Sequence, residues 1–388
     1  MERDMRKNLF ILAGLLLALH ASFAQMRNDT SLTLAVTPTK KDENDHVSYD
    51  GAYSMIECVL SDERATLGGK LYYRLKEAKS SDEEAQKLDV KRAYAKVRPF
   101  GNSFLEIAIG KLYSYYLSGG YFSLTETYTG AVRWGETGVG AKTEFKGLTL
   151  GLALPVTESY VAFSKDWGLN AAASYNFAEI SKNLPFTFGF DVLYSAGGDD
   201  DEDVNNVSEK DFSESVALNF SKRNFGIFSS FGFFLAFSHN VRPYVAHTVL
   251  SPVAEVSSSK SPLYAKVKKS NLFSFALRPT IGKVRVTSES EVGHAVDGNL
   301  IPFYSALQVY FPVYGIVALK PMAGFYAVFD TSDSSNSFRT WEFYPRIMLE
   351  FDKLTVTAGW DIFYKEMSRN DFYWIWTVPI TAKIKIGG

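Results

Sequence analysis

The sequence predicts an all-β protein, a transmembrane antiparallel up-and-down β-barrel of about 18 strands. Three observations predict this fold. Apolar and polar residues alternate along most of the chain, short turns alternate with longer polar loops, and aromatic residues make up 15% of the composition. A strand points successive side chains to opposite faces, so each strand has an apolar face for lipid and a polar face for the lumen. Outer-membrane barrels combine this alternation with short periplasmic turns and longer outer loops.

Residues 271–292 show the alternation most clearly. Apolar side chains occupy alternate positions on both sides of Gly282: Phe273, Phe275, Leu277, Val284, Val286 and Val292. The positions between them include Arg285, Glu289 and Glu291. This segment therefore predicts a hairpin with one apolar and one charged face. A soluble β-sandwich shares that pattern, and the alternation of short turns with long loops favours the barrel.

The N-terminus predicts export. Arg6 and Lys7 precede the apolar run 9–19, and residues 22–24 place small side chains at the two positions that a signal peptidase reads. We expect cleavage after Ala24, so that residues 1–24 are a signal peptide and residues 25–388 form a single barrel domain. The expected location is the bacterial outer membrane, with outer-membrane lipid around the barrel.

The first predicted strands form hairpins with short turns. The turn at residues 61–64 is polar and the turn at residues 99–102 contains proline, as turns commonly do. Residues 40–46 are a predicted polar loop. Up to the first long connection, the predicted strands are residues 32–37, 47–60, 65–76, 89–98 and 103–111. Because residues 32–37 form a short strand, 16 strands are the alternative to 18.

Residues 112–135 form a long connection, which we predict as the third outer loop, and loops of that length tend to be functional. After it, predicted strands are joined by tight turns at residues 146–147, 312–315 and 352–353. Residues 239–270 carry three prolines and have room for a short hairpin of their own. These later strands are residues 137–145, 148–154, 167–177, 186–196, 212–221 and 227–238, the two arms of 271–292, and residues 303–311, 316–329, 339–351, 354–365 and 373–386.

Tryptophans fall near the ends of the predicted strands. Aromatic girdles form there in membrane barrels, because an amphipathic ring is most stable at the membrane interface. The tryptophans in question are Trp134, Trp167, Trp341, Trp374 and Trp376.

Composition and motifs argue against several other classes of protein. A formal net charge of −2 does not favour a nucleic-acid partner, and Cys58 as the only cysteine cannot form an intramolecular disulfide. No Ser or Asp pair accompanies a histidine in the way that an enzyme site requires, so we expect no enzyme and no catalytic residue. The acidic run 199–203 lacks the ligand spacing of a calcium loop. We therefore expect a solvated loop there, no metal site and no cofactor.

The strand at 103–111 and the loop after it carry a resemblance to a known family. Residues 104–111 read Phe-Leu-Glu-Ile-Ala-Ile-Gly-Lys, end in a glycine-basic pair and run into a loop rich in tyrosine and glycine. This pattern resembles bacterial general porins. The resemblance implies a third loop that folds into the barrel and narrows the pore, and it implies a homotrimer. The chain ends in Ile386-Gly387-Gly388, whereas most such barrels end in an aromatic residue.

Charged residues beside this loop suggest a constriction. Opposed charges across a narrow gap create a transverse field that favours polar, oriented solutes. The candidate lining residues are the basic Lys70, Arg74, Lys76, Arg92, Lys96 and Arg98 and the acidic Glu106, Glu126 and Glu136. The alternative is that the basic residues are solvated in the lumen and that Glu126 and Glu136 lie on a surface loop. Other predicted inner charges have both signs, which does not indicate strong ion selectivity: Asp191, Lys320, Glu342, Arg346, Glu350, Asp361, Lys383 and Lys385.

The function predicted from these features is that of a porin, a water-filled channel for passive diffusion of small hydrophilic solutes and ions. One alternative is an outer-membrane transporter for hydrophobic substrates of the fatty-acid type. Such transporters use a plug-like N-terminal segment, whereas the mature N-terminus here is short and polar. Another alternative is a surface adhesin with a non-conducting barrel, which a conductance measurement distinguishes from a porin.

Overall fold

The computed structural model covers the whole chain and describes its membrane-spanning part. The described residues are 27–41, 45–48, 51–75, 86–101, 104–111, 115–116, 133–134, 137–155, 167–196, 211–241, 270–296, 298–333, 338–368 and 371–386. The predicted signal peptide, 1–24, lies outside this range.

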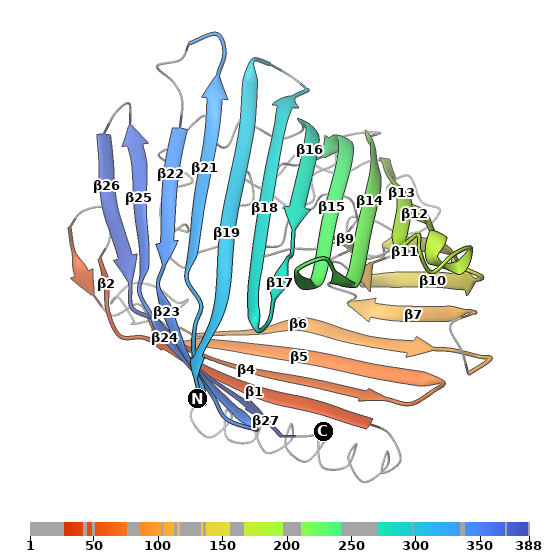
Figure 1. Cartoon of the computed structure of the whole chain (residues 1–388), viewed down its shortest axis with the longest axis horizontal. Helices are drawn as coiled ribbons and strands as arrows, with labels where there is room; N and C mark the ends of the chain where they lie inside the picture. The colour runs from red at the N-terminus through yellow and green to blue at the C-terminus, as the bar shows by residue number, and fades with distance from the viewer. Residues whose placement is uncertain are drawn as a thin grey trace.

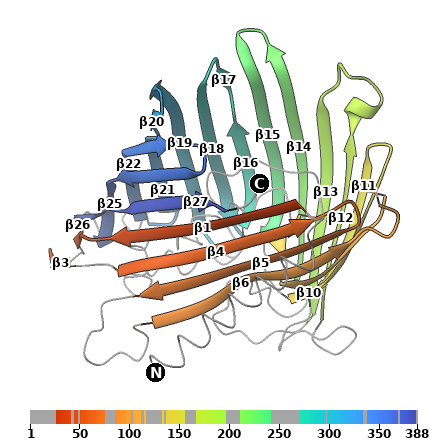
Figure 2. The same ribbon diagram turned by 90° about the horizontal axis from the view of Figure 1, so that it is seen from below.

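The described strands form one closed antiparallel barrel of 18 long strands. Each strand pairs with its neighbour in the sequence, and the ring closes where the first strand pairs with the last (Figure 1). At the closure, Ser31 pairs with Lys385 and Val36 pairs with Ile380. Figure 2 shows the first strands side by side along one edge of the barrel. Closure leaves no free edge in this large sheet over the described residues, which a barrel in lipid requires.

Several of the long strands consist of two segments. The segments are β1 (Arg27–Thr37), β2 (Lys40–Lys41), β3 (Val47–Ser48), β4 (Gly51–Ser61), β5 (Ala65–Leu75), β6 (Gln86–Val97), β7 (Glu106–Lys111), β10 (Thr137–Phe145), β11 (Leu148–Pro155), β12 (Trp167–Asn176), β13 (Phe186–Ala196), β14 (Asp211–Phe225), β15 (Phe228–Val241), β16 (Ser270–Leu277), β17 (Thr280–Ile281), β18 (Val284–Ala295), β19 (Leu300–Tyr314), β20 (Val317–Leu319), β21 (Met322–Asp330), β22 (Phe338–Tyr344), β23 (Arg346–Glu350), β24 (Leu354–Gly359), β25 (Asp361–Ser368), β26 (Asp371–Thr377) and β27 (Ile380–Lys385). A separate pair, β8 (Tyr115–Tyr116) and β9 (Arg133–Trp134), lies within the predicted third loop.

The two faces of the barrel wall differ in chemistry. On β7, Ile107 and Ile109 are 42% and 57% exposed, whereas Glu106 and Ala108 between them are 6% and 0% exposed. Directly paired residues share a face, so the register carries this distinction around the ring. The exposed apolar side chains form the outer, lipid-facing surface, and most polar and charged side chains lie on the inner wall. The ion pair of Arg339 and Glu366 at 3.3 Å is an exception on the outer face, near the loop end. The predicted arrangement, with the charged face around the lumen, is confirmed.

Tight turns join the strands at one end of the barrel. Lys146 and Gly147 both have positive φ, 45° and 81°, as the two-residue hairpin turn between β10 and β11 requires. At the turn between β4 and β5, the Asp62 carboxylate accepts hydrogen bonds from the backbone N–H groups of Arg64 and Ala65 at 2.7 and 2.6 Å. These two bonds hold the pKa of Asp62 below its usual value.

Aromatic side chains gather on the outer surface at two levels. Near the loop end, Trp341 packs between Phe325, 5.0 Å away between ring centroids, and Tyr364, 5.8 Å away. Near the turn end, Phe220 stacks on Phe233 at 5.1 Å. Two aromatic levels separated by an apolar band are typical of outer-membrane barrels. Trp374 and Trp376 are also on the outer surface, while the side chain of Trp167 lies outside the described part.

Five predicted strands are wrong as single continuous strands, because each is interrupted within its span. The predicted strands 316–329, 339–351, 354–365 and 373–386 and the first arm of 271–292 each end and resume within the span. Proline lies at most of these interruptions, and proline has no N–H for the ladder. The interruptions are at Pro38, Pro279, Pro321, Pro345, Trp360 and Pro379. Here β23, β24 and β27 bend away from β22, β25 and β26, which stand upright in Figure 1. We call the line of interruptions on neighbouring strands, at Pro38, Pro321, Pro345, Trp360 and Pro379, the crease.

Other predicted boundaries also need correction. The first strand is Arg27–Thr37 rather than 32–37, because its polar start pairs in register with β4, as Asn28 does with Leu60. Lys40–Lys41, placed in a predicted loop, is strand β2 and pairs with β26 and β3. The predicted turn at 312–315 lies at Gly315, because β19 continues through Pro312 to Tyr314. Among the described residues, no helix is long and apolar enough to cross a membrane.

Leu152, which is exposed on the lipid-facing side of β11, tests the orientation of the wall. We expect Leu152→Arg to lower the free energy of unfolding by roughly 2–4 kcal/mol, because the charge would face hydrocarbon. The measurement is urea unfolding in lipid vesicles. Thr149→Arg is the control, because Thr149 lies on the inner face opposite Glu144. Equal destabilisation by both substitutions would contradict the assignment of the faces.

Candidate functional site: the inner wall of the barrel

The inner wall buries many polar and charged side chains. A wall that faced only lipid or an apolar core would have almost none, because an unpaired buried polar group is costly. Among the described residues, the most buried of them are Thr33, Thr66, Glu106, Ser174, Ser215, Ser238, Ser270, Ser274, Glu289, Glu291, Thr340, Glu342, Asp361 and Thr377. These residues come from strands all around the ring, so the inner surface as a whole is the candidate site.

The structure places several of the predicted constriction residues on one part of this wall. Lys70 on β5 pairs with Arg92 on β6, and Thr66 pairs with Lys96 four residues further along the two strands. Arg74 pairs with Tyr53 of β4. For Arg74 and Arg92 only the strand positions are described, not the side chains. Lys76, Glu126 and Glu136 lie outside the described residues, so their predicted part in a constriction stays a prediction.

Glu106 joins two of the predicted cations. Its carboxylate accepts two hydrogen bonds from Arg98, from Nε at 3.0 Å and from Nη2 at 2.8 Å. Lys96 Nζ lies 3.5 Å from the other carboxylate oxygen. The Glu106 side chain is nearly buried, and both cations are about one-quarter exposed. Charge-assisted bonds of this kind are stronger than neutral ones, so this cluster fixes the orientation of three charges on the wall.

A second polar cluster lies on the wall formed by β18 to β25. The Tyr310 hydroxyl donates a hydrogen bond to Glu350. The Arg285 guanidinium lies over the Tyr310 ring, 4.2 Å from its centroid, within cation–π range. The backbone N–H of Lys320 donates to the carbonyl of Arg346 at 2.8 Å. Lys320, Arg346 and Glu350 were all predicted on the inner side. Lys320 directly follows β20, and Arg346 and Glu350 lie on β23, which pairs with β20.

Glu342 and Asp361 complete this second cluster. The hydroxyls of Tyr326 and Tyr344 both donate to Glu342 Oε2, at 3.0 and 2.6 Å. Arg346 donates from Nη2 to both carboxylate oxygens of Asp361 at 2.8 Å, and its guanidinium lies over the Tyr344 ring at 5.3 Å. Each carboxylate of this second cluster therefore accepts a hydrogen bond, and the wall carries paired charges of both signs.

Sequence reasoning missed the tyrosines of this cluster. Tyr310 lies two positions from Gln308 on β19, Tyr326 lies four from Asp330 on β21, and Tyr344 lies two from Glu342 on β22. Counting by twos from these polar residues could have found the tyrosines, because a strand has a period of two. The alternation of inner and outer side chains continues across the crease, since Leu319 pairs with Ile347 on one side of it and Met322 pairs with Tyr344 on the other.

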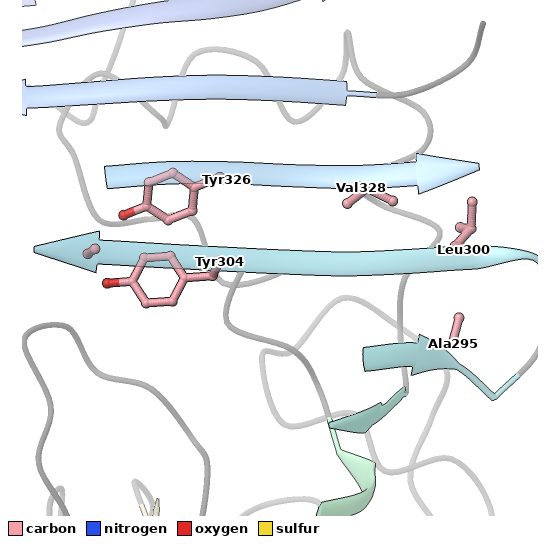
Figure 3. Packing of buried hydrophobic residues seen from close by; sticks show 6 residues of the cluster. Ala295, Leu300, Tyr304, Tyr326 and Val328 are labelled. Carbon is pink, nitrogen blue, oxygen red and sulfur yellow. The ribbon is translucent and has the colours of Figure 1, made fainter. Parts of the chain in front are cut away.

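The inner wall also has an apolar part. Tyr304 and Tyr326 lie side by side on adjacent strands with ring centroids 4.9 Å apart, and Leu300 and Val328 lie further along the same strands (Figure 3). All four are buried. A neighbouring cluster contains Phe234 with small inward side chains around it. The inner surface is therefore not uniformly polar on the wall from β15 to β21.

Water still reaches other inner positions. Thr33 pairs with Lys383, and Ser31 with Lys385, on the inner face at the closure of the ring. Both lysines are exposed, as solvated side chains in an open lumen would be. Asp191 pairs with Ala172 and Ser215 in the described register. Within the described ranges, no three His, Cys, Asp or Glu side chains come together as a metal site would require.

Solved structures with a similar fold include bacterial outer-membrane proteins. The outer-membrane protein OpdK of Pseudomonas aeruginosa matches with a TM-score of 0.54 and 10% identity, over 93% of this chain and 99% of that one. The chain has the fold of bacterial outer-membrane porin-like β-barrels. OccK2 (OpdF) of Pseudomonas aeruginosa, solved in complex with glucuronate, matches with a TM-score of 0.55 and 10% identity, over 92% and 98% of the two chains.

A third similar structure is Wzi of Escherichia coli, described as a carbohydrate-binding β-barrel involved in group 1 capsule assembly. It matches with a TM-score of 0.54 and 10% identity, over 97% of this chain and 88% of that one. No protein-family model and no curated protein sequence matches the chain. At these identities the likeness is one of fold.

Glu106 tests the first cluster. We expect Glu106→Gln to lower the free energy of unfolding by about 1.5–3 kcal/mol, the range for a hydrogen bond to a charged group. It should also shift the reversal potential in a salt gradient toward anions, because Lys96 and Arg98 lose their shared carboxylate. Glu144→Gln is the matched control. Glu144 is paired with Lys142 at 2.8 Å but is 37% exposed, so we expect a loss below about 1 kcal/mol. A larger loss for Glu144→Gln would contradict this account of the site.

Proposed function

We propose that this protein is a porin of the bacterial outer membrane, whose lumen passes small hydrophilic solutes and ions by passive diffusion. The observation that supports it most is the distribution of side chains, apolar outside and charged inside a closed ring of 18 strands. A barrel of this size cannot fill its interior with wall side chains alone. The exposed inner lysines, Lys383 and Lys385, agree with a lumen that holds water.

The pairing of charges on the wall supports a channel without strong ion selectivity. Lys96 and Arg98 share Glu106, Arg346 holds Asp361, and Tyr310 donates to Glu350. Paired charges of both signs orient polar solutes but leave little net field for one sign of ion. The glucuronate bound to OccK2 and the carbohydrate binding of Wzi, both barrels of similar fold, support hydrophilic rather than lipidic cargo.

The proposal includes export and assembly. Residues 1–24 act as a signal peptide cleaved after Ala24, outer-membrane lipid surrounds the apolar band, and the barrels assemble as homotrimers. The chain has no enzymatic activity and binds no nucleic acid. The constriction is formed by Lys70, Arg74, Lys76, Arg92, Lys96, Arg98 and Glu106 on the wall and by Glu126 and Glu136 at the third loop.

Transport of hydrophobic substrates is the second candidate, and one observation favours it. Part of the inner wall is apolar, which a uniformly polar lumen would not show. The packed apolar side chains are Phe234, Leu300, Tyr304, Tyr326 and Val328. A fatty acid has the apolar length to contact such a surface. A non-conducting adhesin barrel is the remaining alternative.

Reconstitution distinguishes these functions. In planar bilayers we expect stable ohmic conductance steps, and in liposomes we expect uptake of neutral sugars that falls steeply as the sugar grows. Heat-denatured protein is the control. Uptake of a labelled fatty acid without any conductance would support the second candidate. The absence of both conductance and uptake would contradict the proposed function and favour an adhesin.

A further inference from the structure

The crease forms a groove on the outer surface of the barrel. Its cavity of about 410 Å³ is lined mainly by apolar side chains of β20, β23 and β24 and of the residues that interrupt the strands there. We call it the crease groove, and its apolar lining residues are Leu319, Pro321, Pro345, Ile347, Ala358 and Trp360. The volume lies within the roughly 300–1,000 Å³ typical of sites for small ligands.

The register places this groove on the lipid side of the wall. Leu319 pairs with Ile347, and Ile347 pairs with Ala358, so the three side chains share one face. Ile347 is 53% exposed and Trp360 is 47% exposed, as the outward apolar residues elsewhere on the barrel are. Arg346 and Gly359 complete the lining, and the Arg346 guanidinium is bound to Asp361 on the inner side. The apolar lining residues therefore lie on the hydrocarbon side of the wall.

The backbone around the groove offers little to a polar ligand. The carbonyl of Pro345 accepts a hydrogen bond from Trp360 N at 3.2 Å, and that of Pro321 accepts one from Val309 N at 3.0 Å. The prolines have no N–H to donate. Since these carbonyls are already engaged, a ligand gains mainly by burying apolar surface here.

The shape of the groove is built by the sequence. Ala358 leaves the floor open, because its side chain is small beside Ile347 and Trp360. Gly359 lets the strands approach closely, since a Cβ there would lie 2.6 Å from Arg346 Cγ and 2.7 Å from the Pro345 carbonyl oxygen. Trp360 is held in turn by an edge-to-face contact with Trp376, with ring centroids 5.8 Å apart. The walls are thus fixed by packing.

We propose that the crease groove binds one acyl chain of a membrane phospholipid. The fold surrounds this surface with lipid hydrocarbon, and a narrow apolar groove is filled by a chain more readily than by a headgroup. The groove lies a few residues from the turns at Gly315 and Asp352-Lys353. The acyl chain therefore belongs to a phospholipid of the leaflet at the turn end. A second copy is the weaker occupant, because a stable protein interface buries about 1,200–2,000 Å², far more than a groove of this size supplies.

Native mass spectrometry of the detergent-solubilised protein tests the proposal. We expect the wild type to retain one phospholipid and Ala358→Phe, which fills the floor, to lose it. Ala141→Phe is the matched control, because Ala141 is also on the lipid side, on β10 opposite Ile107, and we expect it to retain the lipid. Retention by Ala358→Phe, or no retained lipid in the wild type, would overturn the proposal. The proposal would also be overturned if the wild type bound a second copy of the protein and Ala358→Phe lost that copy.

A second measurement does not depend on a variant that fills the groove. The protein is reconstituted with dibrominated phosphatidylcholine and diluted into excess detergent. The difference between wild type and Trp360→Phe isolates the emission of Trp360, and Trp374→Phe does the same for the outward Trp374. We expect Trp374 to recover its fluorescence and Trp360 to stay quenched by a retained chain. Equal recovery of both would show ordinary boundary lipid and would overturn the proposal, while the conductance test of the channel is unaffected.

Discussion

The structure depends on one constraint, that backbone N–H and C=O groups in a membrane must be paired within the protein. An unpaired group in hydrocarbon costs several kcal/mol, so a sheet can cross the membrane only as a closed ring. The pairing of β1 with β27 and β4 meets this condition. At the end of the chain, Lys385 N donates to Lys353 O and Ile386 N donates to Thr30 O, each at 2.8 Å. Once the ring closes, the two-residue period of each strand assigns every side chain to lipid or lumen.

Much of this fold could be predicted because the constraint is local. The predicted strands 137–145 and 186–196 have the bounds of β10 and β13, since glycine and polar residues end them sharply. The crease could not be predicted from periodicity, because alternation continues through Pro321 and Pro345 while the ladder bonds do not. The first strand was predicted too short, because residues 27–31 are polar and lack apolar alternation. They nevertheless pair with β4 as part of β1.

The candidate site was predictable to a smaller degree. The side of the wall followed from alternation, so Lys70, Lys96 and Glu106 were expected inside. The partner of each charge depends on register, which turns and bulges set. An irregularity between Lys70 and Leu71 shifts the pairing of β5 with β6, and no spacing in the sequence reveals it. The contact of Glu106 with Lys96 and Arg98 therefore emerged only from the three-dimensional arrangement.

The barrel wall thus has different properties on its two sides at the crease. Inside, Arg346, Asp361, Tyr344 and Glu342 form a bonded polar surface. Outside, the same strands leave an apolar groove. Proline removes backbone N–H donors at the bend. The bend is tolerated in lipid because the carbonyls of Pro321 and Pro345 accept hydrogen bonds from Val309 and Trp360. At the crease, the same layer of strands therefore carries a polar cluster on its inner face and an apolar groove on its outer face.

The orientation of alternate side chains is tested most directly by single cysteines along β27. In a Cys58→Ser background, cysteines at positions 380–385 are exposed one at a time to a water-soluble thiol reagent in proteoliposomes. We predict reaction at positions 381, 383 and 385, where cysteine replaces Thr381, Lys383 and Lys385 on the inner face. We predict no reaction at positions 380, 382 and 384, which face lipid. Uniform reaction along the strand, or reaction on the opposite set, would contradict a charged lumen within an apolar band.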